Sequence, residues 1–241
     1  MRRFYCPAVN ISTNKIIIND INELHHIKDV LRLKTEDNLI LFDDKGNEYG
    51  CSIKEITNNR IILTIKDRRL PKIPKVKITV ACAIPKKSKM DEIVDGLTQL
   101  GVDRIIPMQT ERVIVKLDRN KMMTRCLRWN KIAQNASEQS QRNTLPMVDK
   151  IMDIRRILSI SDNFDLKLIL TLEGERKNIK EILAKANPKN ILVLIGPEGD
   201  FTHPELDLAK KAGCAAVSLG DSVLRVETAA VAIVSVLRLV L

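Results

Sequence analysis

Two short apolar runs near the carboxyl terminus, residues 191–195 and 215–219, each lead directly into a loop that contains glycine. Runs of this length are typical of buried strands, and a parallel sheet presents its ligand sites at the carboxyl ends of its strands. Only nine glycines occur in 241 residues, and four of them, Gly196, Gly199, Gly213 and Gly220, lie in this section. Glycine indicates close backbone approach or a positive φ angle. The sequence therefore predicts one small-molecule pocket that both loops share.

From residue 76 onward, strand-like and helix-like segments alternate. The predicted strands cover residues 76–84, 104–108, 166–172, 191–195 and 215–219. The predicted helices cover residues 89–100, 119–142, 177–186 and 204–212. The last helix has clear ends, because Thr202 and Glu205 fit a capping box and Gly213 stands where a terminating glycine belongs. This alternation predicts an α/β domain built on a mostly parallel sheet.

The first 70 residues have a different pattern, in which short β-prone runs dominate. These runs cover residues 16–18, 39–42, 49–53 and 61–65, and a short helix is predicted within residues 20–33. A small β-barrel would hide the edges of such strands. Residues 68–75 contain two prolines, which end both periodicities. We therefore expect a β-barrel domain at residues 1–70 and an α/β domain at residues 76–241.

The charge balance is strongly basic, with 40 Lys and Arg against 30 Asp and Glu and a formal charge of +10. Such an excess favours a polyanionic partner, because each neutralised phosphate releases counterions. An ordinary basic surface is the alternative. Aromatic residues make up 3% of the chain, which argues against a platform on which bases stack. The segment 112–131 has one acid, Asp118, and seven basic residues: Arg112, Lys116, Arg119, Lys121, Arg125, Arg128 and Lys131.

Cysteine usage and the apolar segments indicate the compartment. The five cysteines are far apart and never form a Cys-x-x-Cys pair, so neither a disulfide framework nor a zinc site is expected. The first residues lack the apolar core of a signal peptide. The only long apolar run, residues 229–241, is too short to span a bilayer and contains Arg238. We expect a cytoplasmic protein without metal or membrane contact, in which this run is a buried helix.

The loop residues exclude some familiar sites and suggest another. Neither a dinucleotide-binding glycine fingerprint nor a P-loop occurs, and the segment 196–199 alone could be a simple tight turn. The second loop adds Arg225, Glu227 and Thr228 at the expected start of a helix. An arginine there opposes the helix dipole, so it needs another reason to be present. Contact with an anion or a substrate is one such reason.

At this point the sequence resembles the 16S ribosomal RNA uridine N3-methyltransferases (the RsmE family) of the SPOUT superfamily, over essentially its whole length. The resemblance rests on six segments in the same order: residues 1–5 (MRRFY), 25–33 (HHIKDVLRL), 100–102 (LGV), 136–142 (ASEQSQR) with Pro146, 196–199 (GPEG), and 219–220 (LG) with 224–229 (LRVETA). Two positions depart from the family pattern. A second glycine is usual where Asp200 stands, and a lysine is common where Gly96 stands.

The resemblance implies an N-terminal PUA-like β-barrel that binds RNA and a C-terminal SPOUT α/β domain with a deep trefoil knot. It also implies that S-adenosylmethionine (SAM) binds in the knot. The corresponding positions here are Thr171, Leu172, Glu173, Ile195, Gly196, Pro197, Glu198, Gly199, Leu219, Gly220, Val223, Leu224, Arg225 and Thr228. Members of the superfamily pair as homodimers through this domain, which gives residues 229–241 a partner surface. A monomer in which that helix is wholly internal is the alternative.

The reaction that the resemblance implies is methylation of N3 of uridine 1498 in the 16S rRNA of the small ribosomal subunit. Loss of the N3 proton places negative charge on the uracil oxygens, which a fixed guanidinium would stabilise. Arg225 is our candidate for this catalytic role. Glu198 and Glu227 are weaker candidates for the base, since either could cap backbone amides, and His203 is more simply explained by the capping sequence. A binding-only ribosome assembly factor and a SPOUT methyltransferase with another RNA target remain alternatives.

Candidate RNA contacts come from two sources. Four match family positions in the N-terminal domain, and four follow from the distribution of charge: Arg2, Arg3, His26 and Arg32 in the first group, and Lys86, Arg125, Arg128 and Arg142 in the second. Lys87 and Lys89 add to the second group. A run of charge is usually only a solvated face, and His25 and His26 could equally be surface residues of a helix.

Overall fold

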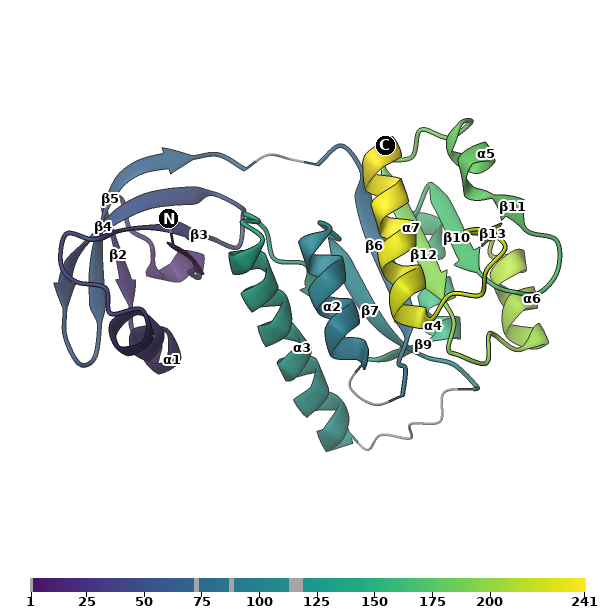
Figure 1. The fold of residues 1–241 in the computed structure, drawn as a ribbon, viewed down its shortest axis with the longest axis horizontal. Helices are drawn as coiled ribbons and strands as arrows, with labels where there is room; N and C mark the ends of the chain where they lie inside the picture. Colours follow the sequence, from purple (N-terminus) through teal and green to yellow (C-terminus); the bar gives the residue numbers. More distant parts are fainter. Residues whose placement is uncertain (1, 72–73, 87–88, 113–118) are drawn as a thin grey trace. The chain divides into compact units, whose positions relative to one another are not determined.

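The structure, a computed structural model, describes residues 2–71, 74–86, 89–112 and 119–241. Its contacts divide the chain into two units (Figure 1). One unit consists of Met1–Ile73 together with Ser137–Leu145, and the other of Pro74–Ala136 together with Pro146–Leu241. A short segment near the middle of the sequence therefore belongs to the first unit.

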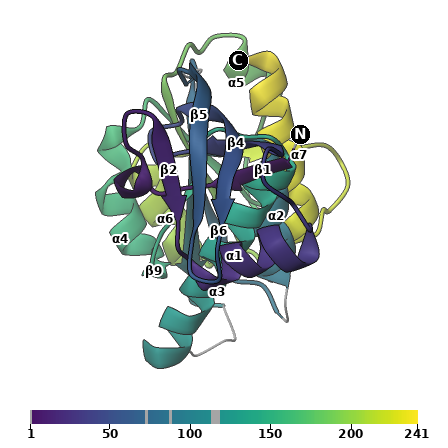
Figure 2. The ribbon, with the colours of Figure 1, turned by 90° about the vertical axis from the view of Figure 1, so that its left-hand side faces the viewer.

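The first unit is built on a five-stranded sheet in the order β1-β3-β4-β5-β2. Figure 2 shows β2, β5 and β4 side by side. The strands are β1 (Arg2–Tyr5), β2 (Lys15–Ile18), β3 (Asn38–Phe42), β4 (Glu48–Ile56) and β5 (Ile61–Arg69). β1 pairs with β3 in parallel, and the other pairs are antiparallel. Four of these strands were predicted; β1 was missed because only four residues of mixed polarity form it.

The sheet order runs from β1 to β2 without a pairing between these two end strands in the described part of the chain. The expected β-barrel is therefore not closed in these strands, which form an open half-barrel sheet. The predicted helix within residues 20–33 is a short helix α1 (Ile21–His25) that continues as a π-helical turn η2 (His26–Val30). Asp20 caps α1, since its side chain accepts hydrogen bonds from the backbone amides of Asn22 and Glu23. A 3-10 turn η1 (Ala8–Asn10) lies between β1 and β2.

Asp43 organises the turn between β3 and β4. Its buried carboxylate accepts hydrogen bonds from the backbone amides of Lys45 and Asn47, from the Asn47 side chain and from the Tyr49 hydroxyl. Burial by itself raises the pKa of Asp43, but the hydrogen bonds from Asn47, Tyr49 and Lys45 outweigh it and hold that pKa below its usual value. The turn chemistry expected between the second and third predicted strands thus depends mainly on one carboxylate.

The second unit is built on an all-parallel sheet in the order β11-β13-β10-β12-β6-β7-β8, with β9 also paired to β7. Its strands are β6 (Lys77–Ala83), β7 (Arg104–Gln109), β8 (Met147–Val148), β9 (Met152–Asp153), β10 (Leu166–Leu170), β11 (Lys177–Asn178), β12 (Asn190–Ile195) and β13 (Ala215–Ser218). This confirms the predicted α/β class with a parallel sheet. All five predicted strands of this region are present.

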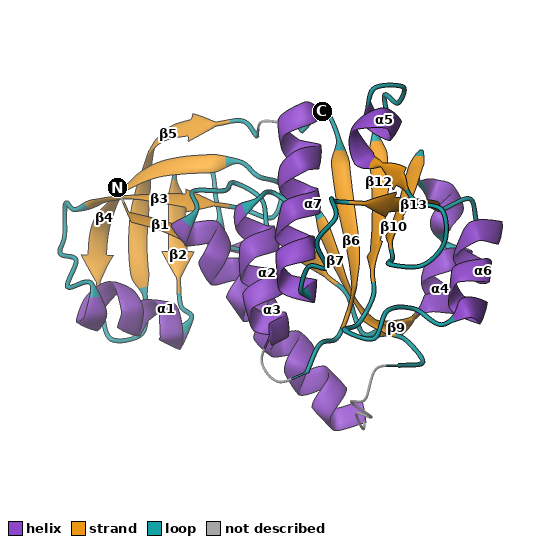
Figure 3. Cartoon of the chain, turned by 45° about the vertical axis from the view of Figure 1, so that its right-hand side comes forward, coloured by secondary structure: helices purple, strands orange, loops and turns teal. Residues whose placement is uncertain are grey.

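Helices cover both faces of this sheet (Figure 3). They are α2 (Lys89–Gln99), α3 (Arg119–Gln139), α4 (Ile154–Ser159), α5 (Ile179–Leu183), α6 (His203–Lys211) and α7 (Val226–Val240), with a 3-10 turn η3 (Ser161–Asn163). Successive residues of a strand point to opposite faces. Accordingly Val80 and Cys82 of β6 belong to the core cluster that includes residues of α2, α3, α5 and α7, whereas Ala81 and Ala83 belong to the cluster that includes residues of α4 and α6. Residues 229–241 were expected to form a buried helix, but only one face of α7 is buried.

The helix ends follow their sequence signals. Thr202 and Glu205 form the predicted capping box of α6, and Gly213 follows this helix with a φ of +80°. The backbone amide of Thr202 donates to Oε2 of Glu205 at 2.9 Å. The segment from β8 to η3 was not predicted, because elements of two to six residues carry too few periodic positions to stand out.

Candidate functional site

The two glycine loops lie together at the carboxyl ends of neighbouring parallel strands, as their sequences predict. The loops that follow β10, β12 and β13 enclose a pocket of about 260 Å³. The first loop contributes Thr171 and Leu172 from the predicted set. The second contributes Ile195, Gly196, Pro197 and Glu198, and the third contributes Leu219, Gly220, Val223, Leu224 and Arg225.

Three residues of the predicted pocket set do not line it. Glu173 turns away and forms an ion pair with the exposed imidazole of His203, with 3.0 Å between Oε2 and Nδ1. The carbonyl of Gly199 accepts a hydrogen bond from Arg112. Thr228 is exposed in the first turn of α7. These residues surround the pocket without forming its wall.

Sequence reasoning missed other lining residues, among them Leu170, Arg176, Asp200, Val217 and Ser222. Arg176 donates from Nη1 to the carbonyl of Thr171 at 3.5 Å. The sequence carried a weak signal for Arg176, because this basic residue lies shortly after Gly174 in the first loop. In the structure Gly174 has a φ of +72°. Leu170 and Val217 are the last inward-facing strand residues before their loops, so extending each predicted loop backward would have found them.

The second loop is tightly built. A Cβ placed on Gly196 would lie 3.0 Å from two carbons of the Phe201 ring, which is fully buried. Asp200 has a φ of +60°, in the left-handed region, and its backbone amide donates to the carbonyl of Pro197 at 2.9 Å. Gly220 in the third loop has a φ of +137° and open space where a Cβ would be. The glycines therefore serve different needs: close packing at Gly196 and an unusual backbone at Gly220.

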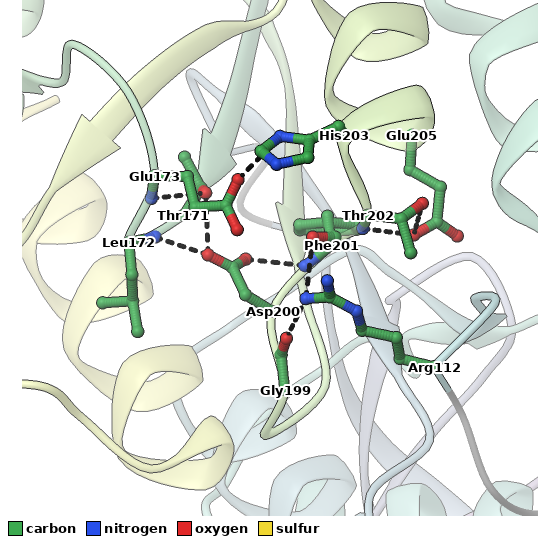
Figure 4. A network of polar contacts seen from close by, with 10 residues as sticks. All are labelled: Arg112, Thr171, Leu172, Glu173, Gly199, Asp200, Phe201, Thr202, His203 and Glu205. Carbon is green, nitrogen blue, oxygen red and sulfur yellow. Dashed lines mark hydrogen bonds and ion pairs between the residues drawn. The ribbon is translucent and has the colours of Figure 1, made fainter.

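A polar network surrounds the second loop (Figure 4). Buried Glu205 accepts hydrogen bonds from the backbone amide of Glu111 at 2.9 Å and from Thr202. The guanidinium of Arg112 donates to the carbonyls of Gly199 and Phe201. The segment after β7 thereby holds the segment after β12. Arg112 was assigned to a basic RNA-facing run, but its side chain is engaged in this network.

Arg225, the predicted catalytic residue, is the N-cap of α7 and lies exposed at the pocket. Its side chain forms no hydrogen bond or ion pair with another residue of the described chain. Its guanidinium is therefore available to a ligand. This position agrees with the inference that an arginine at a helix N-terminus is there for a purpose other than helix stability.

The two candidate bases differ. Glu198 lines the pocket, is exposed, and accepts a hydrogen bond from the backbone amide of Lys86 at 3.3 Å. Glu227 does not line it. A hydrogen bond from its own backbone amide and an ion pair with Lys89 at 3.2 Å hold the pKa of Glu227 below its usual value. A lowered pKa makes a carboxylate a weaker base, so Glu198 is the better placed of the two.

A cysteine lies beneath the pocket but is not suited to nucleophilic chemistry. Cys82 near the end of β6 is fully buried. Burial, with the nearby carboxylates of Glu198 and Glu227, raises the pKa of its thiol to about 12. The thiolate is the nucleophilic form, and it is scarcely populated at neutral pH.

The candidate RNA contacts have different environments, within each unit. Arg2 and Arg32 are exposed, and Arg32 has a φ of +52°. His26 is half-buried against the edge of Phe4, with ring centroids 5.7 Å apart. Arg142 is half-buried and donates to the Thr144 hydroxyl at 3.2 Å.

The environment of Arg3 does not fit the predicted RNA contact. Its side chain is only 7% exposed and pairs with Glu48 at 2.8 Å, and it also donates to the carbonyl of Arg142 and to the side chain of Asn143. These contacts join β1 to the segment 137–145 within the first unit. Arg3 therefore has a structural role and presents little surface to a phosphate.

In the second unit, Lys86 is exposed and Arg125 is half-buried on α3. The side chain of Arg128 is 66% exposed, but its guanidinium pairs with Asp91 of α2 at 2.7 Å. Lys89 forms ion pairs with Glu92 and Glu227. Lys87, Lys116 and Asp118 lie outside the described residues, as does the side chain of Arg119.

None of the described helices is long and apolar enough to cross a membrane. Over the same part of the chain, no group of three or more His, Cys, Asp or Glu residues could hold a metal ion.

Comparison with known proteins agrees with this geometry. Residues 71–238 match the RNA methyltransferase domain family, and residues 18–66 match the RNA methyltransferase PUA domain family. The chain is 32% identical to a ribosomal RNA small subunit methyltransferase E from Rickettsia conorii, over 98% of this chain and 95% of that one.

Solved structures give the same result. A ribosomal RNA small subunit methyltransferase E from Neisseria gonorrhoeae bound to SAM has a TM-score of 0.87 at 31% identity, covering 99% of this chain and 97% of that one. A methyltransferase from Legionella pneumophila in complex with SAM has a TM-score of 0.89 at 29% identity, covering 98% and 96%. The chain therefore belongs to the RNA methyltransferase family, together with the ribosomal RNA small subunit methyltransferases E.

Proposed function

We propose that this protein is a SAM-dependent methyltransferase that methylates N3 of one uridine, uridine 1498 by family resemblance, in the 16S rRNA of the small ribosomal subunit. The observation that carries the proposal is the pocket between the loops after β10, β12 and β13, at the carboxyl ends of adjacent parallel strands. Relatives of similar fold were crystallised with SAM. Ligands bind at this end of the strands in open parallel sheets.

The residues of the pocket fit SAM. Apolar side chains from three strands and their loops, such as Leu170, Ile195 and Leu219, suit an adenine ring. A charged group on the first loop, Arg176, suits the carboxylate at the amino acid end. The open space at Gly220 leaves room that a side chain would fill. A volume of about 260 Å³ is close to the lower end of small-molecule pockets, about 300 Å³.

When bound, SAM supplies a methyl group on a sulfonium, which an in-line nucleophile can displace. The protein then has to position the uridine and to remove its N3 proton. Arg225 can direct its guanidinium at the uracil oxygens, where charge develops as the proton leaves. Glu198 is the carboxylate of this pocket that we assign to proton removal, directly or through a water molecule. Glu227, paired with Lys89, instead holds the start of α7.

The remaining parts of the proposal concern RNA docking and assembly. We infer that the N-terminal domain, residues 1–70, docks on rRNA, with Arg2, His26 and Arg32 as contacts, and that Lys86, Arg125 and Arg142 add to them. By resemblance, the second unit forms a trefoil knot, pairs as a homodimer and works in the cytoplasm. Exposed apolar residues on α7, Val231, Leu239 and Val240, support a partner surface there.

The function is tested by incubating the protein with methyl-labelled SAM and small subunits that lack the modification. We expect label on N3 of a single uridine of the 16S rRNA. Label on a ribose hydroxyl, or on tRNA, would instead assign another SPOUT activity. If calorimetry shows no binding of SAM or S-adenosylhomocysteine (SAH) at high concentration, the binding-only assembly factor becomes the better description.

The basic helix α3 gives a prediction about RNA affinity. RNA affinity falls as salt rises, and Arg125→Ala should make this fall less steep. The magnitude of the slope of log affinity against log salt should decrease by about 0.7–0.9, the value for one phosphate contact. Arg128→Ala should lower it less, because Asp91 already neutralises that guanidinium. Filter binding to 16S rRNA between 50 and 300 mM salt, roughly, would measure both slopes. Arg155→Ala on α4 is the matched control. Equal slopes for Arg125→Ala and Arg155→Ala would show that Arg125 makes no phosphate contact and that α3 is an ordinary solvated helix.

A further inference from the structure

Asp200 occupies a backbone position that few side chains adopt. Its φ is +60°, and its amide closes a turn onto the carbonyl of Pro197 at 2.9 Å. Glycine has no steric penalty there, whereas among other residues Asp and Asn are the most tolerant. A residue that keeps a Cβ in this region is held by its surroundings, so the contacts of its side chain are the place to look for a reason.

The carboxylate of Asp200 joins two segments that are far apart in the sequence. Oδ2 accepts hydrogen bonds from the hydroxyl of Thr171 at 2.9 Å and from the backbone amide of Leu172 at 2.7 Å. Oδ1 accepts one from the backbone amide of Phe201 at 2.8 Å. Figure 4 shows the carboxylate between these groups. One side chain thus connects the loop after β10 to the loop after β12.

Both connected loops line the pocket, and few other polar contacts join them in the described part of the chain. The hydroxyl of Thr171 also accepts a hydrogen bond from the amide of Glu173 at 3.1 Å, which extends the effect of the carboxylate through the first loop. Another link within the described residues is the ion pair between Glu173 and His203, whose side chain is 83% exposed. Exposed ion pairs contribute little. The carboxylate of Asp200 is therefore the main connection.

We propose that Asp200 is a positioning residue: its carboxylate clamps the loop after β10 onto the loop after β12 and so fixes the shape of the methyl-donor pocket before the donor binds. The inference rests on the proposed binding of SAM. Without the clamp, Thr171 and Leu172 have to be ordered when the ligand binds, and that ordering reduces affinity. The role is one of geometry, because all three hydrogen bonds of the carboxylate go to the protein itself.

Two substitutions test the clamp. Asp200→Asn keeps the tolerance for a positive φ but leaves one acceptor oxygen, and Asp200→Gly keeps the backbone and removes the clamp. Calorimetry should show SAM and SAH binding weakened about tenfold in Asp200→Asn and about 30-fold or more in Asp200→Gly, in proportion to the hydrogen bonds lost. The two ligands should lose the same factor. The KM for SAM should rise by a similar factor, while kcat at saturating SAM changes less than about threefold.

Asp165 provides a matched control on the same sheet. Its Oδ2 accepts hydrogen bonds from the backbone amides of Lys189 and Asn190 at 2.8 Å each, at the amino ends of β10 and β12. Asp165→Asn removes the negative charge from a comparable carboxylate link away from the pocket. We expect it to lower the melting temperature but to leave the affinity for SAM unchanged. The control thus separates pocket geometry from general stability.

Hydrogen exchange tests the clamp without any ligand. The Leu172 amide should exchange at least about tenfold faster in Asp200→Gly than in the wild type, and Asp165→Asn should leave it unchanged. Equal exchange in wild type and Asp200→Gly overturns the clamp, as does a loss of affinity for SAM but not for SAH, which would show direct contact with the sulfonium. Failure of the wild type to bind SAM instead overturns the proposed function, and the exchange result still decides the clamp.

Discussion

Arg225→Ala is expected to lower turnover by about 100- to 1,000-fold, the range seen when one preorganised donor to a developing oxyanion is removed. The residue is the N-cap of α7, lies at the pocket, and its guanidinium has no hydrogen-bond or ion-pair partner among the other described residues. Its charge helps to lower the pKa of Glu227, but its N–H donors are not used by the described part of the chain. The affinity for SAM should change less than about threefold, since the guanidinium is assigned to charge that appears only in the transition state. Single-turnover kinetics with saturating SAM would measure the effect.

Arg176 supplies the comparison for this prediction. It is a second exposed arginine at the same pocket, on the loop that follows β10. Because we place it near the amino acid end of SAM, Arg176→Ala should weaken cofactor binding and leave single-turnover chemistry at saturation nearly unchanged. Equal losses of affinity and turnover in Arg225→Ala would show that Arg225 only shapes the pocket. Arg225→Lys should recover a minor part of the rate, because an ammonium cannot reproduce the bidentate geometry of a guanidinium.

The elements that the sequence predicts correctly share strong local signals. The strand β12 is an unbroken apolar run, and α6 begins with a capping box and is followed by a glycine of positive φ. The elements that were missed, such as β1, β8 and α4, are short, and tertiary pairing rather than local pattern defines them. The closure of the first sheet could not be read from the strands alone, because it depends on which strands become its edges.

In the site, too, the local sequence predicts some features, whereas contacts with distant segments determine others. The loop motifs identify where the pocket is, because they follow buried strands whose carboxyl ends lie side by side. The partners of charged residues are set by distant segments: Asp200 binds Thr171 and Leu172, and Arg3 binds Glu48. Charge counts treat Arg3 and Arg32 alike, yet one is buried and the other exposed. Only the folded chain distinguishes an exposed cation from one that binds its own neighbour.

Gly196→Ala is expected to weaken SAM binding at least about tenfold and to lower stability by about 1–3 kcal/mol, the range for overpacking a filled core. The added Cβ would lie 3.0 Å from two ring carbons of Phe201 and 3.4 Å from Oδ1 of Asp200. Phe201 is fully buried against Leu194 and its neighbours, so the ring has no free space to enter. The loop must then move toward the pocket that it lines. Thermal unfolding should show a fall of about 2–12 °C, and calorimetry should show the loss of affinity.

Gly96→Ala is the control for Gly196→Ala, because it also adds a Cβ in a tight place but next to a side chain that can move. A Cβ on Gly96 would lie 3.2 Å from Val231, nearly as close as the contacts at Gly196, but Val231 is 39% exposed and can turn away. Gly96 lies inside α2, where alanine is favoured over glycine by about 1 kcal/mol. Gly96→Ala should therefore be neutral or stabilising and should bind SAM as the wild type does. If both variants bind SAM normally, the packing of Phe201 under Gly196 does not determine the pocket, and its shape must depend on the other loops.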